Sequence, residues 1–461
     1  MQAAPLPGIV ESVNPATGER LAQWPLLDDA GIERAIALAH DGFLRWSRTP
    51  VRERAKVMQA IGQALRRERA ALARLITLEM GKPITEAEAE VDKSAWACEH
   101  VADVGEEWLA DQVVSTTAQR SYIALRPLGT VLSIFPWNFP AWQVFRCAAS
   151  ALMSGNTMLM KHSPNTQGSA AAIEKLVAGC GGPPGLLVNL NAPVSRIGSV
   201  IADSRIAAVT LTGSPAAGMK VASQAGAACK KSVLELGGSD AFIVLADADL
   251  DAAVAAGVRA RFSNCGQVCL AAKRFLLESP IAEEFSHRFV AATAALRIGD
   301  PLDRSTQIGP LAREDLRTQL QQQVAQSTAA GARILTGGTQ RPGAGWYYTP
   351  TVLGHIDRAM PVYAQETFGP AAAMLTVSGA DEAVRIANDS PFGLSTMLWT
   401  RDLDRAARLA RELQVGSVFV NAVTASDPRM PVGGVKLSGY GRELGKTGLH
   451  ELCNVQTVWI A

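Results

Sequence analysis

The amino-acid sequence predicts an α/β protein with two large domains built on parallel β-sheets. Its 461 residues exceed the length at which a single hydrophobic core stops growing. Short β-branched runs alternate with longer helical patterns rich in Ala, Leu and Arg. One of the strands leads into a glycine turn and a helix, the arrangement that binds phosphate at a helix N-terminus. These three observations together predict the fold class.

Composition gives no indication of a nucleic-acid or membrane partner. The chain has 44 basic and 43 acidic residues and a net charge of +1. It lacks a run of about 18 apolar residues and a basic N-terminal segment followed by an apolar one. We therefore expect a soluble, cytoplasmic protein. Its seven cysteines are sparsely spaced without a Cys-x-x-Cys pair, so neither a disulfide framework nor a metal site is expected.

The first third of the chain is mainly helical. A turn-forming cluster at residues 14–19 precedes helical patterns from residue 28 to about residue 80, each with one apolar stripe. A Gly-Lys-Pro break precedes a further helix over residues 85–109. Residues 120–134 change to β-branched, alternating character, which predicts strands, and a helix over 141–152 and a buried strand over 156–161 follow.

Strands over residues 185–190 and from residue 207 lead to the glycine turn. Residues 207–218 read A-A-V-T-L-T-G-S-P-A-A-G, which departs from the usual G-x-G-x-x-G pattern. Strands over 232–236 and 241–245 follow, and the alternation of strand and helix continues to about residue 429, which predicts the second α/β domain. A strand over 454–460 ends the chain, and no internal repeat is present, which excludes a solenoid.

Three motifs carry candidate catalytic residues. Residues 261–270 read R-F-S-N-C-G-Q-V-C-L and place Cys269 in a short polar turn, a setting expected to expose the thiol and lower its pKa. Residues 234–240 read L-E-L-G-G-S-D and place the carboxylate of Glu235 ahead of that cysteine. Residues 136–140 read P-W-N-F-P, where Asn138 is either a turn residue or an amide directed at a developing oxyanion.

Together these motifs resemble the active-site pattern of the aldehyde dehydrogenase superfamily, F-x-N-x-G-Q-x-C following E-L-G-G. The segments T-G-S at 212–214, Q-E-T-F-G-P at 365–370 and P-V-G-G-V-K-L-S-G at 431–439 are similar to further family signatures, with Val432 replacing the usual Phe. The resemblance implies an aldehyde dehydrogenase-like fold with two Rossmann-type domains and a β arm. It divides the chain into a dinucleotide-binding domain (1–115 and 128–236), a catalytic domain (237–430) and an oligomerisation arm (116–127 and 446–461). A homodimer or homotetramer is implied, because an exposed edge strand is a template for pairing.

The resemblance also implies the role of each site residue. Cys269 would attack an aldehyde, Asn138 and the Cys269 backbone N–H would stabilise the oxyanion, and Glu235 would activate the water that hydrolyses the thioester. Pro164 stands where NAD-preferring relatives often carry a glutamate, so either NAD or NADP is expected. The residues implied to bind the cofactor are Trp137, Lys161, Ser163, Gly213, Ser214, Glu366 and Phe368. His162 is expected to be structural or to lie near the cofactor ribose.

The substrate is indicated by Arg146, eight residues after Asn138 on a mostly apolar helix. Its guanidinium either forms an internal ion pair or grips a substrate carboxylate. Relatives that oxidise succinate semialdehyde carry an arginine at this spacing, and Ser426 matches a second carboxylate contact, although Ser263 stands where others have another arginine. We therefore expect succinate semialdehyde oxidation, with glutarate semialdehyde or a broad range of aldehydes as alternatives.

Two further alternatives remain open from the sequence. A thiol esterase could use the same cysteine, and a non-catalytic scaffold could keep the fold, although the motifs argue against the scaffold. Cys265, four residues before Cys269, is either structural or the partner of Cys269 in a reversible disulfide.

Overall fold

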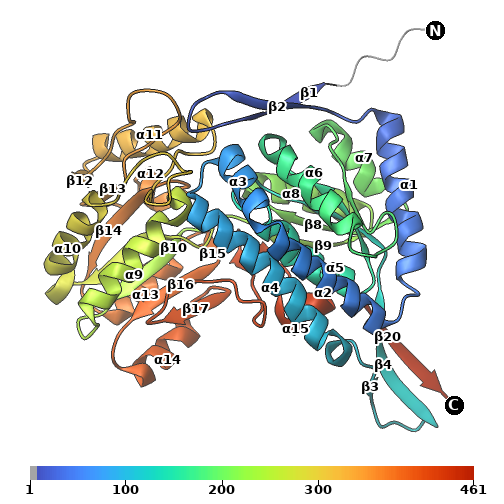
Figure 1. Ribbon diagram of the computed structural model, residues 1–461. Coiled ribbons are helices and arrows are strands. Elements are labelled where there is room, and N and C mark those ends of the chain that lie inside the picture. Colours follow the sequence, from blue (N-terminus) through green and yellow to red (C-terminus); the bar gives the residue numbers. More distant parts are fainter. Residues whose placement is uncertain (1–7) are drawn as a thin grey trace.

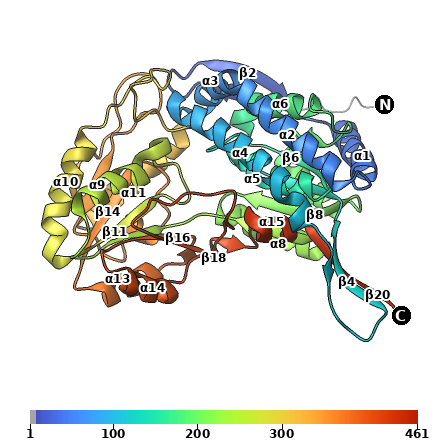
Figure 2. The ribbon, with the colours of Figure 1, turned by 60° about the horizontal axis from the view of Figure 1, so that its bottom comes forward.

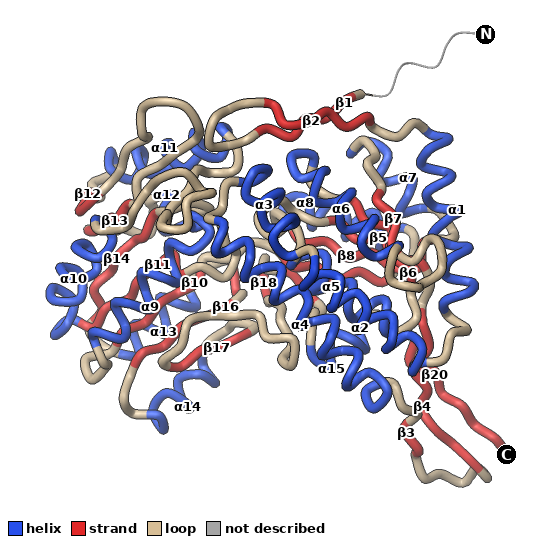
Figure 3. Tube along the Cα trace, viewed as in Figure 1, coloured by secondary structure: helices blue, strands red, loops and turns tan. Residues whose placement is uncertain are grey.

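The computed structural model describes residues 8–461, which form two helix-covered sheets and a protruding β arm (Figure 1). Residues 1–7, the start of the expected dinucleotide-binding domain, lie outside the described residues. Figure 3 shows the strands of both large sheets lying between helices. The α/β fold class expected from the alternating strand and helix patterns is confirmed. Among residues 8–461, no helix combines the length and apolar character needed to cross a membrane.

The first sheet has six strands in the order β19-β9-β8-β5-β6-β7. Neighbouring strands are parallel, except that β19 runs antiparallel to β9. The strands are β5 (Thr130–Ile134), β6 (Thr157–Lys161), β7 (Leu187–Asn189), β8 (Ile206–Thr212), β9 (Lys231–Glu235) and β19 (Gly439–Tyr440). Every residue of β6 is buried, as expected for a parallel strand covered on both faces.

Helices cover both faces of this sheet. Side chains alternate along a strand, so Val131 packs into one core with α2 to α6, whereas Leu132 packs into another with α1, α7 and α8. The helices are α1 (Asp29–Trp46), α2 (Val51–Arg67), α3 (Arg69–Met80), α4 (Ile84–Trp108), α5 (Trp142–Met153), α6 (Gln167–Ala178), α7 (Ile197–Ala202) and α8 (Pro215–Ala227).

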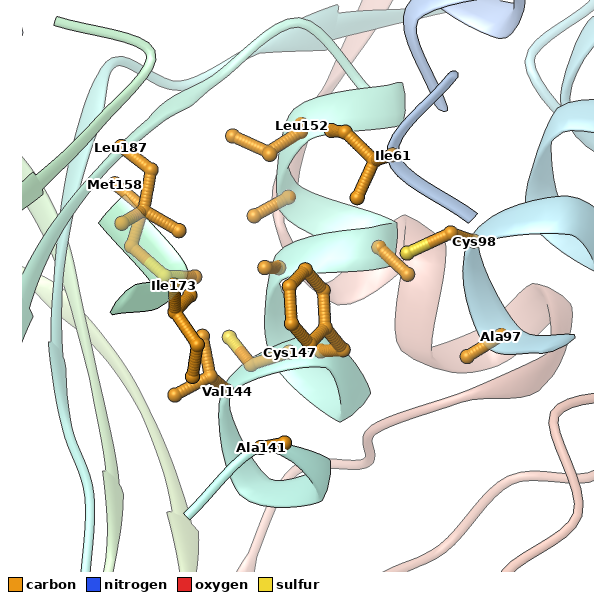
Figure 4. Close-up of a cluster of buried hydrophobic side chains, with 14 of the residues drawn as sticks. Ile61, Ala97, Cys98, Ala141, Val144, Cys147, Leu152, Met158, Ile173 and Leu187 are labelled. Atoms are coloured by element: carbon orange, nitrogen blue, oxygen red, sulfur yellow. The ribbon is translucent and has the colours of Figure 1, made fainter. Parts of the chain in front are cut away.

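Helix α5 is the most enclosed helix of this domain, with all twelve of its residues buried. Figure 4 shows Met158 and Leu187 of the sheet on one side of α5, and Ile61 and Cys98 of α2 and α4 on the other. The Glu90 carboxylate of α4 accepts the first free N–H groups of α5, as expected at a helix N-terminus. This packing holds the side chains of α5 that reach the site described below.

The second sheet has seven strands in the order β12-β13-β14-β11-β10-β16-β17, all parallel except β12. The strands are β10 (Asp240–Val244), β11 (Ala272–Glu278), β12 (Arg333–Thr336), β13 (Thr351–Gly354), β14 (Ala371–Val377), β16 (Ser395–Trp399) and β17 (Ser417–Val420). A core that includes Phe242, Phe275 and Phe289 packs against one face, and a smaller core packs against the other. The helices are α9 (Leu250–Phe262), α10 (Ala282–Ala294), α11 (Glu314–Ala329) and α12 (Pro361–Ala364), with α13 (Ala380–Asn388) and α14 (Leu403–Glu412) on the smaller core.

A three-stranded antiparallel sheet forms the arm, which extends away from both domains (Figure 2). Strand β20 (Cys453–Ile460) pairs along its whole length with β4 (Arg120–Pro127), and β3 (Gln112–Val113) lies on the other side of β4. The remaining elements are β1 (Ile9–Val13), β2 (Arg20–Pro25), β15 (Phe392–Gly393), β18 (Val435–Lys436) and α15 (Gly445–Glu451).

Candidate active site

Cys269 lies in the loop that connects α9 to β11. Within this loop Asn264, Cys265 and Gly266 have φ angles of 50°, 55° and 74°, a left-handed conformation that costs energy for residues other than glycine. At Gly266 a Cβ would lie 2.4 Å from the Gly369 carbonyl oxygen, so a glycine is required there. A buried guanidinium, that of Arg261, donates hydrogen bonds of 2.6 and 2.7 Å to the carbonyls of Gly266 and Gly369. The loop therefore has one defined conformation.

A buried ammonium holds the end of the same loop. Lys273 donates hydrogen bonds to the carbonyls of Val268 and Cys269, at 3.0 and 2.5 Å. Its Nζ also lies 3.5 Å from the Glu366 carboxylate, which accepts the Gly238 N–H at 3.0 Å. Lys273 thus links the cysteine loop to one of the residues expected to bind the cofactor.

Asn138 joins the cysteine loop to the first domain. Its side-chain nitrogen donates to the backbone carbonyl of Gln267 at 3.0 Å, and its backbone carbonyl accepts from the side-chain amide of Asn264 at 2.8 Å. An asparagine amide has two N–H groups, so one remains for another acceptor. Since Asn138 and Cys269 line the same cavity, this second N–H is available to an oxygen of a molecule bound at the sulfur.

Two cavities meet at Cys269. The larger, of about 640 Å³, is lined by most of the residues expected to hold a dinucleotide: Trp137, Ser163, Gly213, Ser214, Glu366 and Phe368. The smaller, of about 290 Å³, is lined by both residues expected to contact a substrate, Arg146 and Ser426. One sulfur can therefore face a cofactor on one side and an aldehyde on the other.

The larger cavity has the features of a dinucleotide site. Ser214 caps α8, its Oγ accepting the Ala217 N–H at 3.3 Å, and the helix N-terminus borders the cavity. Trp137 and Phe368 meet edge to face with centroids 5.7 Å apart. At Gly237 a Cβ would lie 2.3 Å from Glu366 Oε2, so this glycine makes room for the glutamate. The residues present therefore fit NAD or NADP.

Lys161 does not line either cavity. It ends β6 as expected, but its side chain is buried and Nζ donates to the His162 carbonyl at 2.9 Å. Burial lowers the pKa of Lys161 to about 8. The next residue, His162, is buried and hydrogen-bonded to the Pro140 carbonyl at 3.0 Å, which supports a structural role.

Glu235 lies at the end of β9, buried next to Arg146 and Glu443 rather than on a cavity wall. Burial raises the pKa of its carboxyl to about 8, with Arg146 opposing the rise and Glu443 adding to it. Its Oε1 has no hydrogen-bond partner among residues 8–461. A group with this pKa can exchange a proton near neutral pH.

The expectation of a lowered thiol pKa at Cys269 is wrong. Burial raises the pKa of Cys269 to about 11, although Arg146 and Lys273 act in the opposite direction. Carboxylates compensate both cations, because Glu443 pairs with Arg146 and Glu366 with Lys273. The polar turn seen in the sequence is only partly exposed in the folded protein.

The position of Arg146 is compatible with both roles considered from the sequence, an internal ion pair and a contact with a substrate carboxylate. Its guanidinium forms an ion pair with Glu443 and donates to Thr212 Oγ at 3.0 Å, yet it also borders the smaller cavity. Ser426 lies on the wall of the same cavity, and its Oγ accepts from Lys93 Nζ at 2.9 Å and from Trp142 Nε1 at 3.1 Å.

Cys265 packs as a structural residue. It lies 1% exposed in the core of the second domain. Burial raises the pKa of its thiol far above the ordinary value. Disulfide formation with Cys269 would require this buried turn to open.

Sequence reasoning missed four charged residues of the site: Lys93, Arg261, Lys273 and Glu443. Arg261 and Lys273 lie close in sequence to Cys269, and this closeness is the one feature from which their role could have been predicted. Lys93 and Glu443 lie far from Cys269 in sequence, and only folding brings Lys93 to the smaller cavity and Glu443 to Arg146. Among residues 8–461, no group of three or more His, Cys, Asp or Glu side chains could hold a metal ion.

Known proteins resemble this chain over nearly its full length. A sequence model described as the aldehyde dehydrogenase family matches residues 4–458. The chain is 50% identical over 448 residues to the succinate semialdehyde dehydrogenase Sad of Escherichia coli, named for NAD(P)+, with 97% of each chain covered. It is 45% identical over 452 residues to a probable NADP(+) succinate-semialdehyde dehydrogenase of Synechocystis, covering 98% of this chain and 100% of the relative. The solved succinic semialdehyde dehydrogenase of Streptococcus pyogenes in complex with NADP+ superposes with a TM-score of 0.96 at 33% identity, covering 98% of this chain and 99% of that one. Given these matches and the cysteine, asparagine and glutamate described above, the chain belongs to the aldehyde dehydrogenase family.

Proposed function

We propose that this protein oxidises succinate semialdehyde to succinate with NAD or NADP as the hydride acceptor. The observation that carries the proposal is the position of Cys269 between a dinucleotide-like cavity and a smaller cavity bordered by cationic side chains. Relatives that share half or nearly half of its residues are named for this reaction.

In the proposed reaction the Cys269 thiol loses its proton to solvent, and the thiolate adds to the aldehyde carbon to form a thiohemiacetal. The free N–H of Asn138 and the backbone N–H of Cys269 donate to the oxyanion, which is stabilised because these donors are already oriented. Trp137, Ser214 and Phe368, with the other residues of the larger cavity, would hold NAD(P), which when bound would supply the hydride acceptor. Loss of hydride from the thiohemiacetal carbon would leave a thioester on Cys269.

Glu235 would then take a proton from the water that attacks the thioester, releasing succinate and the cysteine. Rotation of the Glu235 side chain would have to move the carboxylate from Arg146 and Glu443 toward the sulfur. Its raised pKa suits this task, since a general base works best when its pKa lies near the operating pH.

Use of either cofactor is supported by the entrance of the larger cavity. Ser163 lines it, and Pro164 contributes no carboxylate that would repel the 2′-phosphate of NADP. Lys161 would hold the cofactor after its ammonium leaves the His162 carbonyl.

A homodimer or homotetramer joined through the arm belongs to the same proposal. The arm has unpaired strand edges and exposed apolar side chains, Val113, Val455 and Trp459 among them, at 81%, 62% and 54% exposure. Such an edge favours pairing with a second copy. Light scattering of the protein with and without residues 453–461 tests this.

Initial rates test the proposed activity. We expect the highest kcat/KM with succinate semialdehyde, a lower value with glutarate semialdehyde, and the lowest with butanal, the four-carbon aldehyde without a carboxylate. NAD(P)H absorbance should rise only when both aldehyde and dinucleotide are present. Equal rates with succinate semialdehyde and butanal would contradict the substrate, and ester hydrolysis independent of dinucleotide, without aldehyde oxidation, would favour the esterase.

A further inference from the structure

Three cationic side chains border the smaller cavity: Lys93 of α4, Arg146 of α5 and Arg259 of α9. Arg146 is buried and its charge is matched by the Glu443 carboxylate. Among the ion pairs of residues 8–461, neither Lys93 nor Arg259 has a carboxylate partner. The uncompensated positive charge of this cavity therefore resides on Lys93 and Arg259.

The carboxylates closest to Lys93 have other partners. Glu90 pairs with the buried Lys82, and Asp427 forms a salt bridge of 2.7 Å with Arg429. Glu86, which also lines the cavity, accepts the backbone N–H of Asn264 at 2.7 Å. Within residues 8–461, each of these carboxylates is therefore engaged by another group, and none forms a salt bridge with the Lys93 ammonium.

The Lys93 ammonium has one hydrogen-bond partner within the described chain, Ser426 Oγ at 2.9 Å. It lies 4.4 Å from the centre of the Trp142 ring, a cation–π distance, and the indole N–H of Trp142 donates to the same Ser426 oxygen. An ammonium has three N–H donors, so at least one remains for a bound anion.

We propose that Lys93, assisted by the Ser426 hydroxyl, binds the terminal carboxylate of the substrate in the smaller cavity, which Cys269 also lines. The inference rests on the proposed function and narrows it, because it selects aldehydes that carry a carboxylate. Arg146, on the wall of the same cavity, also holds Glu443 and places positive charge near Glu235 and Cys269.

Burial distinguishes Lys93 from Arg259. The Arg259 side chain is exposed, so solvent and salt screen its charge, whereas Lys93 is half-buried. Burial lowers the pKa of Lys93 to about 8, with Arg146 acting in the same direction and Asp427 and Glu90 in the other. A carboxylate bound next to this ammonium would raise the pKa of Lys93 and keep the side chain protonated. The ion pair would in turn stabilise the bound substrate.

The test compares Lys93→Met with Arg259→Met, two variants that each remove one cation from the same cavity. For Lys93→Met we expect kcat/KM with succinate semialdehyde to fall by about 10- to 100-fold, mainly through KM, as for the loss of a charged hydrogen bond. The value with butanal should change by less than about threefold, because that substrate has no group for the ammonium to bind. Arg259→Met should change neither value.

Two further measurements separate binding from folding. Lys93→Arg keeps the charge and should recover part of the preference for succinate semialdehyde. The inhibition constant of succinate, measured against butanal oxidation, should rise in Lys93→Met by a factor similar to the rise in KM. If Lys93→Met loses both activities and Lys93→Arg restores both equally, Lys93 is structural and the inference is wrong.

The remaining outcomes distinguish the inference from the proposed function. A wild-type protein that oxidises succinate semialdehyde no better than butanal overturns both. A wild-type preference that survives in Lys93→Met, or that is lost in Arg259→Met instead, overturns the role of Lys93 and leaves the proposed function standing.

Discussion

Arg146→Met should destabilise the protein in a pH-dependent way, because it leaves the buried Glu443 carboxylate without a partner. Both side chains are almost fully enclosed, at 2% and 6% exposure. Removing one partner of such a pair costs about 3–5 kcal/mol, and the lost hydrogen bond to Thr212 adds about 1 kcal/mol. We therefore expect a loss of about 4–6 kcal/mol when Glu443 is ionised.

The sign of the pH dependence follows from protonation of Glu443. Burial already raises the pKa of this carboxyl, and Arg146 opposes the rise. Without Arg146 the pKa in the folded protein rises further above that in the unfolded chain, so folding favours the protonated acid. Stability of the variant is therefore best at mildly acidic pH and falls as the pH rises through the raised pKa.

Thermal unfolding of Arg146→Met, Glu443→Gln and the double variant, at mildly acidic and mildly alkaline pH, measures this effect. The double variant should be more stable than Arg146→Met at alkaline pH, since it leaves no unpaired charge. Arg52→Met, which breaks an exposed pair with Glu106, is the matched control and should change little. If the stability losses of Arg146→Met and Glu443→Gln add up to the loss of the double variant, and none of them depends on pH, the ion pair between these residues does not carry this stability.

Four further predictions follow from the site. Asn138→Ala should lower kcat by about 10²- to 10³-fold with little change in aldehyde KM, since it removes an oxyanion donor; steady-state kinetics with unchanged kcat would contradict this role. Glu235→Gln should release one equivalent of NAD(P)H in a burst and then turn over about 10²- to 10⁴-fold more slowly. In the wild type, thioester hydrolysis should accelerate as the pH rises through about 8, where Glu235 loses its proton. If stopped-flow measurements show that Glu235→Gln turns over at the wild-type rate, Glu235 is not the base. Gly237→Ala should raise the KM of the dinucleotide and leave that of the aldehyde unchanged, because the new Cβ would lie 2.3 Å from Glu366 Oε2; the opposite pattern of KM values would refute the reasoning. The ratio of kcat/KM for succinate semialdehyde over butanal should fall as the pH rises through about 8, where the free protein loses the charge on Lys93, and a ratio independent of pH would place the binding charge elsewhere.

Local patterns in the sequence were enough to predict most of the elements. The helix expected over residues 85–109 is α4 (Ile84–Trp108), and the strand expected over 156–161 is β6 (Thr157–Lys161). Helical and strand periodicity depends on neighbours a few residues apart, so it can be read along the chain. The cysteine, asparagine and glutamate motifs were visible for the same reason, because each is a short run of consecutive residues.

The electrostatic state of the site was decided by the tertiary structure. The polar turn at Cys269 predicted a lowered thiol pKa, but burial raises it, and the cations that would lower it are paired with carboxylates. The sequence left open whether Arg146 is ion-paired or faces the substrate, and its partner Glu443 lies almost 300 residues away.

Lys93 could not be identified from the sequence at all, since a lysine on a helix with a polar face is ordinarily solvated. It becomes notable only because folding places it beside Ser426 and Trp142, where the neighbouring carboxylates of Glu90 and Asp427 are paired with other cations. The sequence by itself determined which chemical groups this protein has and the local elements that carry them. The tertiary structure decided which of those groups are buried and which charges are compensated, because desolvation and Coulomb interaction depend on distance in space rather than on separation along the chain.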